Sequence, residues 1–112
     1  MIKPIFINDR ELSSNHRPFI IAEISANHNG SIDRALETIS VAKQTGVDAV
    51  KIQTYTPDTM TIDSENEDFF IKKGMWRGRS LYDLYSEAFT PFDWHESLFK
   101  HAKDIDITLF ST

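Results

Sequence analysis

The sequence has 112 residues, enough for one small domain with a modest hydrophobic core. Hydrophobic residues make up 40% and charged residues 26% of the chain, which is the composition of a soluble globular protein and excludes a disordered one. The net charge of -5 argues against sequence-independent binding of nucleic acid, and the absence of cysteine excludes disulfides and thiolate metal sites.

The N-terminal residues predict a β-hairpin over residues 1–18. Residues 2–7 form a short apolar segment, and the turn-like residues 8–12 lead into a second short strand. Pro18 then suits the start of a strand, where its missing N–H does least harm. Residues 19–24 (FIIAEI) predict the first strand of the main sheet, buried over its first four residues.

A helical pattern follows this strand. Five apolar residues between Ile32 and Ala42 recur at helical spacing, with Ser31 as the N-cap and Gly46 as the glycine just after the helix. Residues 47–53 (VDAVKIQ) predict a second strand. A strand, a helix and a strand with short connections form a βαβ unit, so we expect these two strands to be parallel neighbours.

A third unit is predicted near the end of the chain. Thr90 as N-cap, Pro91 at the first helical position and Asp93 in the first turn indicate the start of a helix. Apolar and aromatic residues between 94 and 102 form one face of that helix, and residues 107–112 (ITLFST) predict a third strand.

Residues 54–89 are an insertion far longer than an ordinary connection between a strand and a helix. Within it, residues 80–89 predict a short helix. The insertion fits either a functional lid or a segment that merely covers the fold. Trp76, Tyr82 and Tyr85 could stack on a sugar, although packing is the more usual role of such residues.

Three strands that alternate with helices fit either a doubly wound sheet or a (β/α)8 barrel. A barrel needs eight strands and about 250 residues. We interpret residues 19–112 as about three βα units, an incomplete N-terminal portion of a (β/α)8 TIM barrel that follows the hairpin. A free-standing protein of three strands would expose a hydrophobic sheet edge, which natural proteins avoid.

Charged and polar residues stand at the ends of the predicted strands. Side chains alternate along a strand, so the barrel interior would receive Glu23 from the first strand and Lys51 and Gln53 from the second. These residues stand at the carboxyl ends of neighbouring strands, where catalytic residues of barrels sit. The alternative is a buried Glu23–Lys51 ion pair with a structural role only, and we favour function because such pairs contribute little stability. A lysine can hold a carboxylate or phosphate there, and an acid can stabilise positive charge or move a proton.

His28 follows the first strand and has three possible roles: a metal ligand, a hydrogen-bond donor to substrate, or a residue that orders the loop. The last is favoured, because Asn29 beside it has an ordinary turn role. His16, His95 and His101 have no clustered partners and are interpreted as surface or helix-face residues. No metal-ligand spacing is present.

The motif IIAEISANHNGS at residues 20–31, followed by GVDAVKIQTYTPDT at 46–59, resembles the N-terminal part of the sialic acid synthase family. That family condenses phosphoenolpyruvate with a sugar aldehyde. The segments SANHN, QTYTPDT and MWRGRSLYDLYSEAFTPFDWH look most like its pseudaminic acid synthase branch. Neuraminate synthases tend to carry glycine near Ser25 or Ala26 and a different loop around Trp76. The resemblance covers residues 2–112 but only the first part of such an enzyme.

The resemblance implies a (β/α)8 barrel, often followed by a small antifreeze-like domain that completes the partner subunit's site in a homodimer. It also implies a divalent cation, Mn2+ or Mg2+, that polarises the aldehyde of an open-chain 2,4-diacetamido-2,4,6-trideoxy sugar. The C3 carbon of phosphoenolpyruvate then attacks, water adds at C2 and phosphate leaves by C–O cleavage. The ligands of this cation are expected outside the present chain.

For individual residues, the resemblance implies that Glu23 lies near C2, where positive charge develops, and that Lys51 meets the carboxylate of phosphoenolpyruvate. Gln53 would lie against the sugar, and Thr112 would hydrogen-bond the same carboxylate. The remaining residues expected to bind substrate are Asn27, His28 and Tyr55.

We therefore expect a transferase that forms a C–C bond from phosphoenolpyruvate, making pseudaminic acid from small-molecule substrates, with the 112 residues alone inactive. N-acetylneuraminate or legionaminate synthase is one alternative, and a non-catalytic binding module is another. No apolar run approaches about 18 residues, and the first residues lack a signal-peptide pattern, so we expect a cytoplasmic protein without membrane or nucleic-acid partners.

Overall fold

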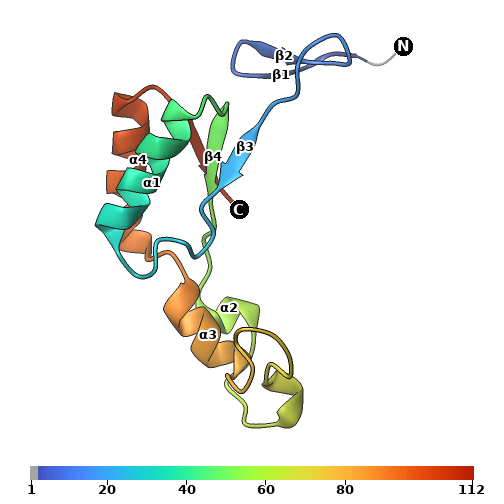
Figure 1. The fold of residues 1–112 in the computed structure, drawn as a ribbon, viewed down its shortest axis with the longest axis vertical. Helices are drawn as coiled ribbons and strands as arrows, with labels where there is room; N and C mark the ends of the chain where they lie inside the picture. The colour runs from blue at the N-terminus through green and yellow to red at the C-terminus, as the bar shows by residue number, and fades with distance from the viewer. Residues whose placement is uncertain (1–2) are drawn as a thin grey trace.

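A computed structural model describes residues 3–112 as an α/β fold with a parallel sheet. Two helices, α1 (Ile32–Gln44) and α4 (His95–Asp104), lie side by side on one face of this sheet (Figure 1). The predicted βαβ arrangement is confirmed, because consecutive strands are parallel neighbours. In spatial order the strands are β3 (Ile21–Glu23), β4 (Ala49–Ile52) and β5 (Thr108–Ser111).

The predicted N-terminal hairpin is also confirmed. Strands β1 (Ile5–Ile7) and β2 (Arg10–Leu12) pair antiparallel and form a separate small sheet beyond the amino-terminal end of β3 (Figure 1). The turn between them passes through Asn8, which has a φ of 51°. Ile2, which belongs to the predicted first segment, lies outside the described residues.

Asp48, immediately before β4, ties the hairpin region to the sheet. Its carboxylate accepts hydrogen bonds from the Arg17 guanidinium at 2.7 and 3.0 Å and from the Ile20 N–H at 2.8 Å. It also forms an ion pair with Arg10 of β2. These contacts, the Arg17 hydrogen bond first among them, lower the pKa of Asp48 to about 2.

Helix α1 begins and ends where the sequence predicts. The Ser31 hydroxyl accepts a hydrogen bond from the Arg34 N–H at 3.3 Å, which satisfies one of the free donors of the first turn. Gly46 follows the helix with a φ of 85°, a left-handed conformation that favours glycine.

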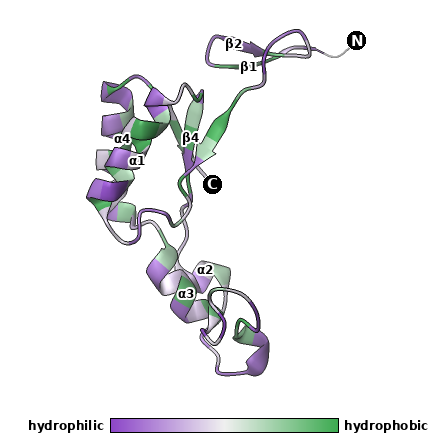
Figure 2. Ribbon diagram, viewed as in Figure 1, coloured by the Kyte–Doolittle hydropathy of each residue, from purple (hydrophilic) through white to green (hydrophobic). Residues whose placement is uncertain are grey.

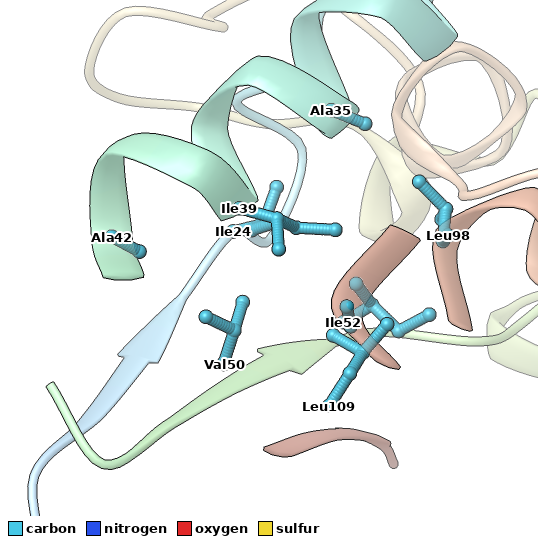
Figure 3. Packing of buried hydrophobic residues seen from close by; sticks show 9 residues of the cluster. Ile24, Ala35, Ile39, Ala42, Val50, Ile52, Leu98 and Leu109 are labelled. Atoms are coloured by element: carbon cyan, nitrogen blue, oxygen red, sulfur yellow. The ribbon is translucent and has the colours of Figure 1, made fainter. Parts of the chain in front are cut away.

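The hydrophobic core lies between these two helices and the face of the sheet that they cover (Figure 3). Full burial of side chains such as Ile39 and Leu98 contributes about 1.5–3 kcal/mol each relative to exposure. Figure 2 shows hydrophobic colouring on β3 and mixed colouring around both helices, as expected for amphipathic helices on a sheet. The buried core residues are Ile24, Ala35, Ile39, Ala42, Val50, Ile52, Leu98, Ala102 and Leu109.

The opposite face of the sheet carries no helix within residues 3–112 and is called the open face. The prediction of a buried strand over residues 19–22 is therefore wrong: Ile20 is 50% and Ile21 is 42% exposed. Ile21 points to the open face, which meets solvent, whereas Ile20 precedes the first paired residue of β3, which is an edge strand. The other two predicted strands are confirmed but shorter, because regular pairing covers only 49–52 and 108–111.

The insertion extends beyond the carboxyl ends of the strands (Figure 1). It contains the short helix α2 (Pro57–Met60), a 3-10 turn η1 (Glu67–Phe69) and helix α3 (Leu81–Ala88). The predicted short helix is thus confirmed, and the Ser80 hydroxyl caps it by accepting from the Asp83 N–H at 3.1 Å. No helix within residues 3–112 combines the length and hydrophobicity needed to span a bilayer.

The predicted N-cap at Thr90 is wrong. Helix α4 begins at His95, after a 3-10 turn η2 (Phe92–Trp94) whose first flanking residue is Pro91, and no side chain caps that turn. Thr90 is only 1% exposed, and its hydroxyl is bonded to Nε2 of His28 at 3.2 Å. The Thr90 hydroxyl therefore bonds to His28, which is buried and distant in sequence, and does not cap α4 as the local pattern predicts.

Candidate functional site

Glu23 and Lys51 face each other across β3 and β4. They are register partners in the parallel pair, and Lys51 Nζ lies 2.6 Å from Glu23 Oε1. Both point to the open face, since the intervening residues Val50 and Ile52 belong to the core. The predicted adjacency is confirmed.

The exposure of this pair bears on its two interpretations. Within residues 3–112 the Glu23 side chain is 58% exposed and that of Lys51 22%, so the alternative of a buried ion pair does not describe it here, and its functional role stays a prediction. An ion pair this exposed contributes about 1 kcal/mol or less to stability. The pair is therefore available for interaction with a ligand on the open face.

Gln53 and Thr112 lie next to each other just beyond the strand ends. The Thr112 N–H donates to Ile52 O at 3.2 Å, and the Thr54 N–H donates to Thr112 O at 2.8 Å, so the pairing of β4 with β5 continues past their last regular residues. Alternation puts Gln53 on the same face as Lys51, and Thr112 is exposed beside it. The structure thus brings four predicted residues to the carboxyl end of one face.

Asn27 closes the turn after β3. Its backbone N–H and its Nδ2–H both donate to Ile24 O, at 3.0 and 2.8 Å. Ser25, between them, has a φ of 51°, a left-handed conformation that costs a non-glycine residue about 1 kcal/mol or more. The side chain of Asn27 is exposed, and its role in substrate binding stays a prediction.

His28 is 1% exposed and both ring nitrogens are occupied. Nδ1 accepts from the Gly30 N–H at 3.1 Å, so the neutral ring carries its proton on Nε2 and donates to the Thr90 hydroxyl. The ring meets Trp94 edge-on, with centroids 5.1 Å apart. Burial lowers the pKa of His28. These contacts order the loop, and a substrate contact stays a prediction.

Tyr55 lies at the start of the insertion and packs edge-on against Tyr85 of α3, with centroids 5.7 Å apart. Burial, together with the neighbouring Tyr85, raises the pKa of Tyr55. Its observed partner is thus within the insertion, and its predicted contact with substrate also stays a prediction.

Sequence reasoning missed a cluster on the helix-covered side of the same strand ends. His95, interpreted from sequence as lacking partners, has Nε2 2.7 Å from the Thr54 hydroxyl, which is itself bonded to the Ser111 hydroxyl. Alternation gave a usable signal: Thr54 and Ser111 fall on the face of the core residues Ile52 and Leu109, where a polar side chain needs a partner.

Two hollows lie away from these residues. One, about 650 Å³, is at the amino-terminal ends of the strands and includes Lys43, Lys103 and Asp106, so it is at the opposite end from the Glu23–Lys51 pair. A second, about 200 Å³ and entirely apolar, lies on the open face. Its lining comes from the hairpin region and all three strands: Ile7, Phe19, Ile21, Ala49, Thr108 and Phe110.

A metal centre does not fit the side chains of residues 3–112. Within this range, no group of three or more His, Asp or Glu residues is placed to hold an ion. Glu23 already engages Lys51, and His28 has both nitrogens occupied. The divalent cation implied by the resemblance would need ligands from outside this range.

Comparison with known proteins decides the family. The model of the NeuB family matches residues 38–112, which is more than half of the chain. The chain belongs to the NeuB family. This NeuB-family chain is 51% identical over 100 residues to pseudaminic acid synthase of Campylobacter jejuni, and 44% identical over 95 residues to pseudaminic acid synthase of Helicobacter pylori.

Other relatives carry different names. N,N'-diacetyllegionaminic acid synthase of Legionella pneumophila is 32% identical over 94 residues. The alignment with the Campylobacter jejuni protein covers 89% of this chain but 29% of the relative, and that with the Helicobacter pylori protein covers 85% and 28%. The NeuB-family chain thus spans less than a third of the length of these curated relatives.

Two solved structures share the fold. N-acetylneuraminic acid synthetase of Leptospira borgpetersenii, solved with citrate, superposes with a TM-score of 0.74 at 23% identity, over 97% of this chain and 33% of that one. Spore coat polysaccharide biosynthesis protein SpsE of Bacillus subtilis gives a TM-score of 0.66 at 26% identity, over 97% and 27%. The α/β arrangement of this NeuB-family chain therefore recurs inside larger proteins.

Proposed function

We propose that this chain is the phosphoenolpyruvate-binding, N-terminal part of a pseudaminic acid synthase. The observation that carries the proposal is the Glu23–Lys51 pair, set at the carboxyl end of the sheet and open to solvent. The identity of 51% to a pseudaminic acid synthase supports the choice of reaction. The chain would act as part of a longer protein, and its residues alone would be inactive.

The complete protein is proposed to be a (β/α)8 barrel. Parallel strands covered by helices on one face, with an apolar hollow on the other, are what a segment of such a barrel presents. In a closed barrel the open face becomes the interior, so Glu23 and Lys51 would line the mouth at the catalytic end. Residues 1–18 would form a hairpin at the opposite end.

Lys51 and Thr112 are proposed to bind the carboxylate of phosphoenolpyruvate. An ammonium and a carboxylate 4 Å apart attract by about 4 kcal/mol near a protein surface. In the ligand-free chain Glu23 neutralises Lys51, and a bound carboxylate would compete for that ammonium. Glu23 would then face C2, where it stabilises the positive charge that develops as C3 attacks the aldehyde.

The sugar would lie beyond this pair, toward the insertion. Gln53 follows Lys51 on the same face, and Asn27, His28 and Tyr55 are the further residues proposed to shape its site. A divalent cation, Mn2+ or Mg2+, bound by residues outside this chain would polarise the aldehyde. The proposed setting is a cytoplasmic homodimer that binds small molecules and neither nucleic acid nor membrane.

The sugar is proposed to be a 2,4-diacetamido-2,4,6-trideoxy sugar of the pseudaminic acid type. The difference between 51% identity to a pseudaminic acid synthase and 32% to a legionaminic acid synthase favours it. The test is phosphate release by the full-length protein with phosphoenolpyruvate and either 2,4-diacetamido-2,4,6-trideoxy-L-altrose or N-acetylmannosamine. Condensation with N-acetylmannosamine alone would reject the sugar, and binding of phosphoenolpyruvate without turnover would favour the non-catalytic module.

The role of Glu23 has its own test. We expect Glu23→Gln in the full-length protein to lower kcat about 100-fold or more, because the amide removes the negative charge that opposes the developing positive charge. Glu37→Gln, on the exposed side of α1, is the matched control and should leave kcat unchanged. Equal kcat for Glu23→Gln and the unmutated protein would refute the catalytic role.

A further inference from the structure

His95, Thr54 and Ser111 form a chain of side-chain hydrogen bonds behind the carboxyl ends of β4 and β5. His95 Nδ1 lies 3.2 Å from Pro91 O, and a carbonyl can only accept, so this nitrogen carries a proton. In the neutral ring Nε2 therefore accepts the Thr54 O–H, at 2.7 Å. Thr54 Oγ1 is left to accept from the Ser111 hydroxyl, which also lies 3.2 Å from the acceptor Thr112 O. His95 thus defines the direction of the Thr54 hydrogen bond.

The imidazole also contacts two aromatic neighbours, Phe92 of η2 and Phe99 of α4. It stacks between Phe92 and Phe99, with centroids 5.7 and 6.3 Å away and interplanar angles of 26° in both cases. Two stacked rings and a hydrogen bond at each nitrogen restrict the orientation of the His95 ring. The ring therefore presents Nε2 to the Thr54 hydroxyl in one orientation.

The cluster lies one residue away from two residues of the proposed site. Thr54 follows Gln53, and Ser111 precedes Thr112. Thr54 also donates its N–H to Thr112 O at 2.8 Å, so the two strand ends are joined through both backbone and side chains. Because side chains alternate, fixing Thr54 and Ser111 on the helix side fixes the direction of Gln53 and Thr112 on the open face.

We propose that His95 is a positioning residue that acts through Thr54 and Ser111 to hold Thr112 and Gln53 in the geometry that binds phosphoenolpyruvate and the sugar. The inference rests on the proposed function. It predicts that loss of the Thr54–His95 bond loosens substrate binding more than it slows the chemical step, since Glu23 lies on β3, outside the β4 and β5 ends that Thr54 and Ser111 join.

The test uses the full-length protein with two pairs of variants. Thr54→Val removes the hydroxyl at nearly constant shape, whereas Thr54→Ser keeps it. His95→Asn keeps a donor for Pro91 O but is too short to reach Thr54, whereas His95→Gln places an acceptor near the position of Nε2. We expect Thr54→Val and His95→Asn to raise KM for phosphoenolpyruvate about tenfold, with kcat within about threefold. Thr54→Ser and His95→Gln should stay within about threefold of the unmutated KM.

A structural role alone would give a different result. Destabilisation lowers the fraction of active protein, and therefore kcat, without raising KM. Ser40→Ala is the matched control, because it breaks a hydrogen bond of 2.7 Å from His101 of the same helix to α1, away from the strand ends. It should leave KM unchanged. For a variant without turnover, the Kd for phosphoenolpyruvate measured by calorimetry replaces KM.

Each outcome bears on a separate claim. If the unmutated protein condenses its substrates but Thr54→Val and His95→Asn keep its KM, the positioning role is wrong and the proposed function stands. An equal rise of KM in Thr54→Val and Thr54→Ser also overturns the positioning role, because the hydroxyl would then be irrelevant. If the unmutated protein performs no condensation, the proposed function fails and the positioning role fails with it.

Discussion

His28 links the loop after β3 to the end of the insertion, and its removal should be costly. His28→Ala takes away the acceptor of the Gly30 N–H and the donor to the Thr90 hydroxyl. A buried hydroxyl without a partner costs about 1–3 kcal/mol, and truncation of a buried ring costs about 3–5 kcal/mol, part of which is the same loss. We expect His28→Ala to lower the free energy of unfolding by about 3–5 kcal/mol.

Equilibrium unfolding in urea measures this change. Thr90→Val removes only one hydrogen bond and should cost about 1–2 kcal/mol. In the double variant the loss of free energy of unfolding should be about 1 kcal/mol smaller than the sum of the two single losses, since His28 and Thr90 share one hydrogen bond. A loss below about 0.5 kcal/mol for His28→Ala would refute the reasoning, because the ring would then be dispensable to the loop.

The same residue makes stability depend on pH. Burial lowers the pKa of His28 below 6.5, so the unfolded chain binds a proton that the folded chain resists. The contribution of His28 is complete above pH 6.5 and is lost as the pH falls from there through the lowered folded-state pKa. His28→Gln should lack this part of the profile while keeping whatever the other histidines contribute. Identical profiles for the two proteins would contradict the assignment.

Two further predictions concern the hairpin region and the turn after β3. Asp48→Asn should lower the urea midpoint of unfolding, because the carboxylate that holds the Arg17 guanidinium is lost, whereas Asp9→Asn should not. In the unmutated chain the stability that Asp48 contributes should be complete above pH 3.8 and vanish as the pH falls to about 2. An equal midpoint for Asp48→Asn and the unmutated chain would show that Asp48 is not the anchor. Ser25→Gly should raise the free energy of unfolding by up to about 1 kcal/mol, because glycine adopts a φ of 51° without strain, whereas Ala26→Gly, at a residue without a positive φ, should lower it. If thermal unfolding shows a lower stability for both variants, the turn is unstrained.

Features set by short-range patterns could be predicted from the sequence. The spacing of apolar residues, with Ser31 and Gly46 at its ends, places α1 to within one residue at each end. Alternation along two neighbouring strands brings Glu23 and Lys51 together. In both cases the physical cause acts over a few residues, so the sequence contains the needed information.

Features set by contacts between residues distant in sequence could not be predicted from the sequence. Thr90 has the local signature of an N-cap, yet its partner His28 lies 62 positions earlier. His95 has no partner nearby in sequence, and Thr54 lies 41 positions away. The exposure of Ile21 likewise depends on which face of the sheet the helices cover, and periodicity does not specify that.

The two threonine–histidine bonds have a consequence for how this fold varies. Thr54 and Thr90 stand at the two ends of the insertion, and each is held by a histidine outside it. A chain whose ends are already fixed pays only about 0.6 kcal/mol of closure entropy for each doubling of its length. The insertion between Thr54 and Thr90 can therefore change in length and sequence at little cost in stability. Such a change would leave the strands that carry Glu23 and Lys51 unaltered.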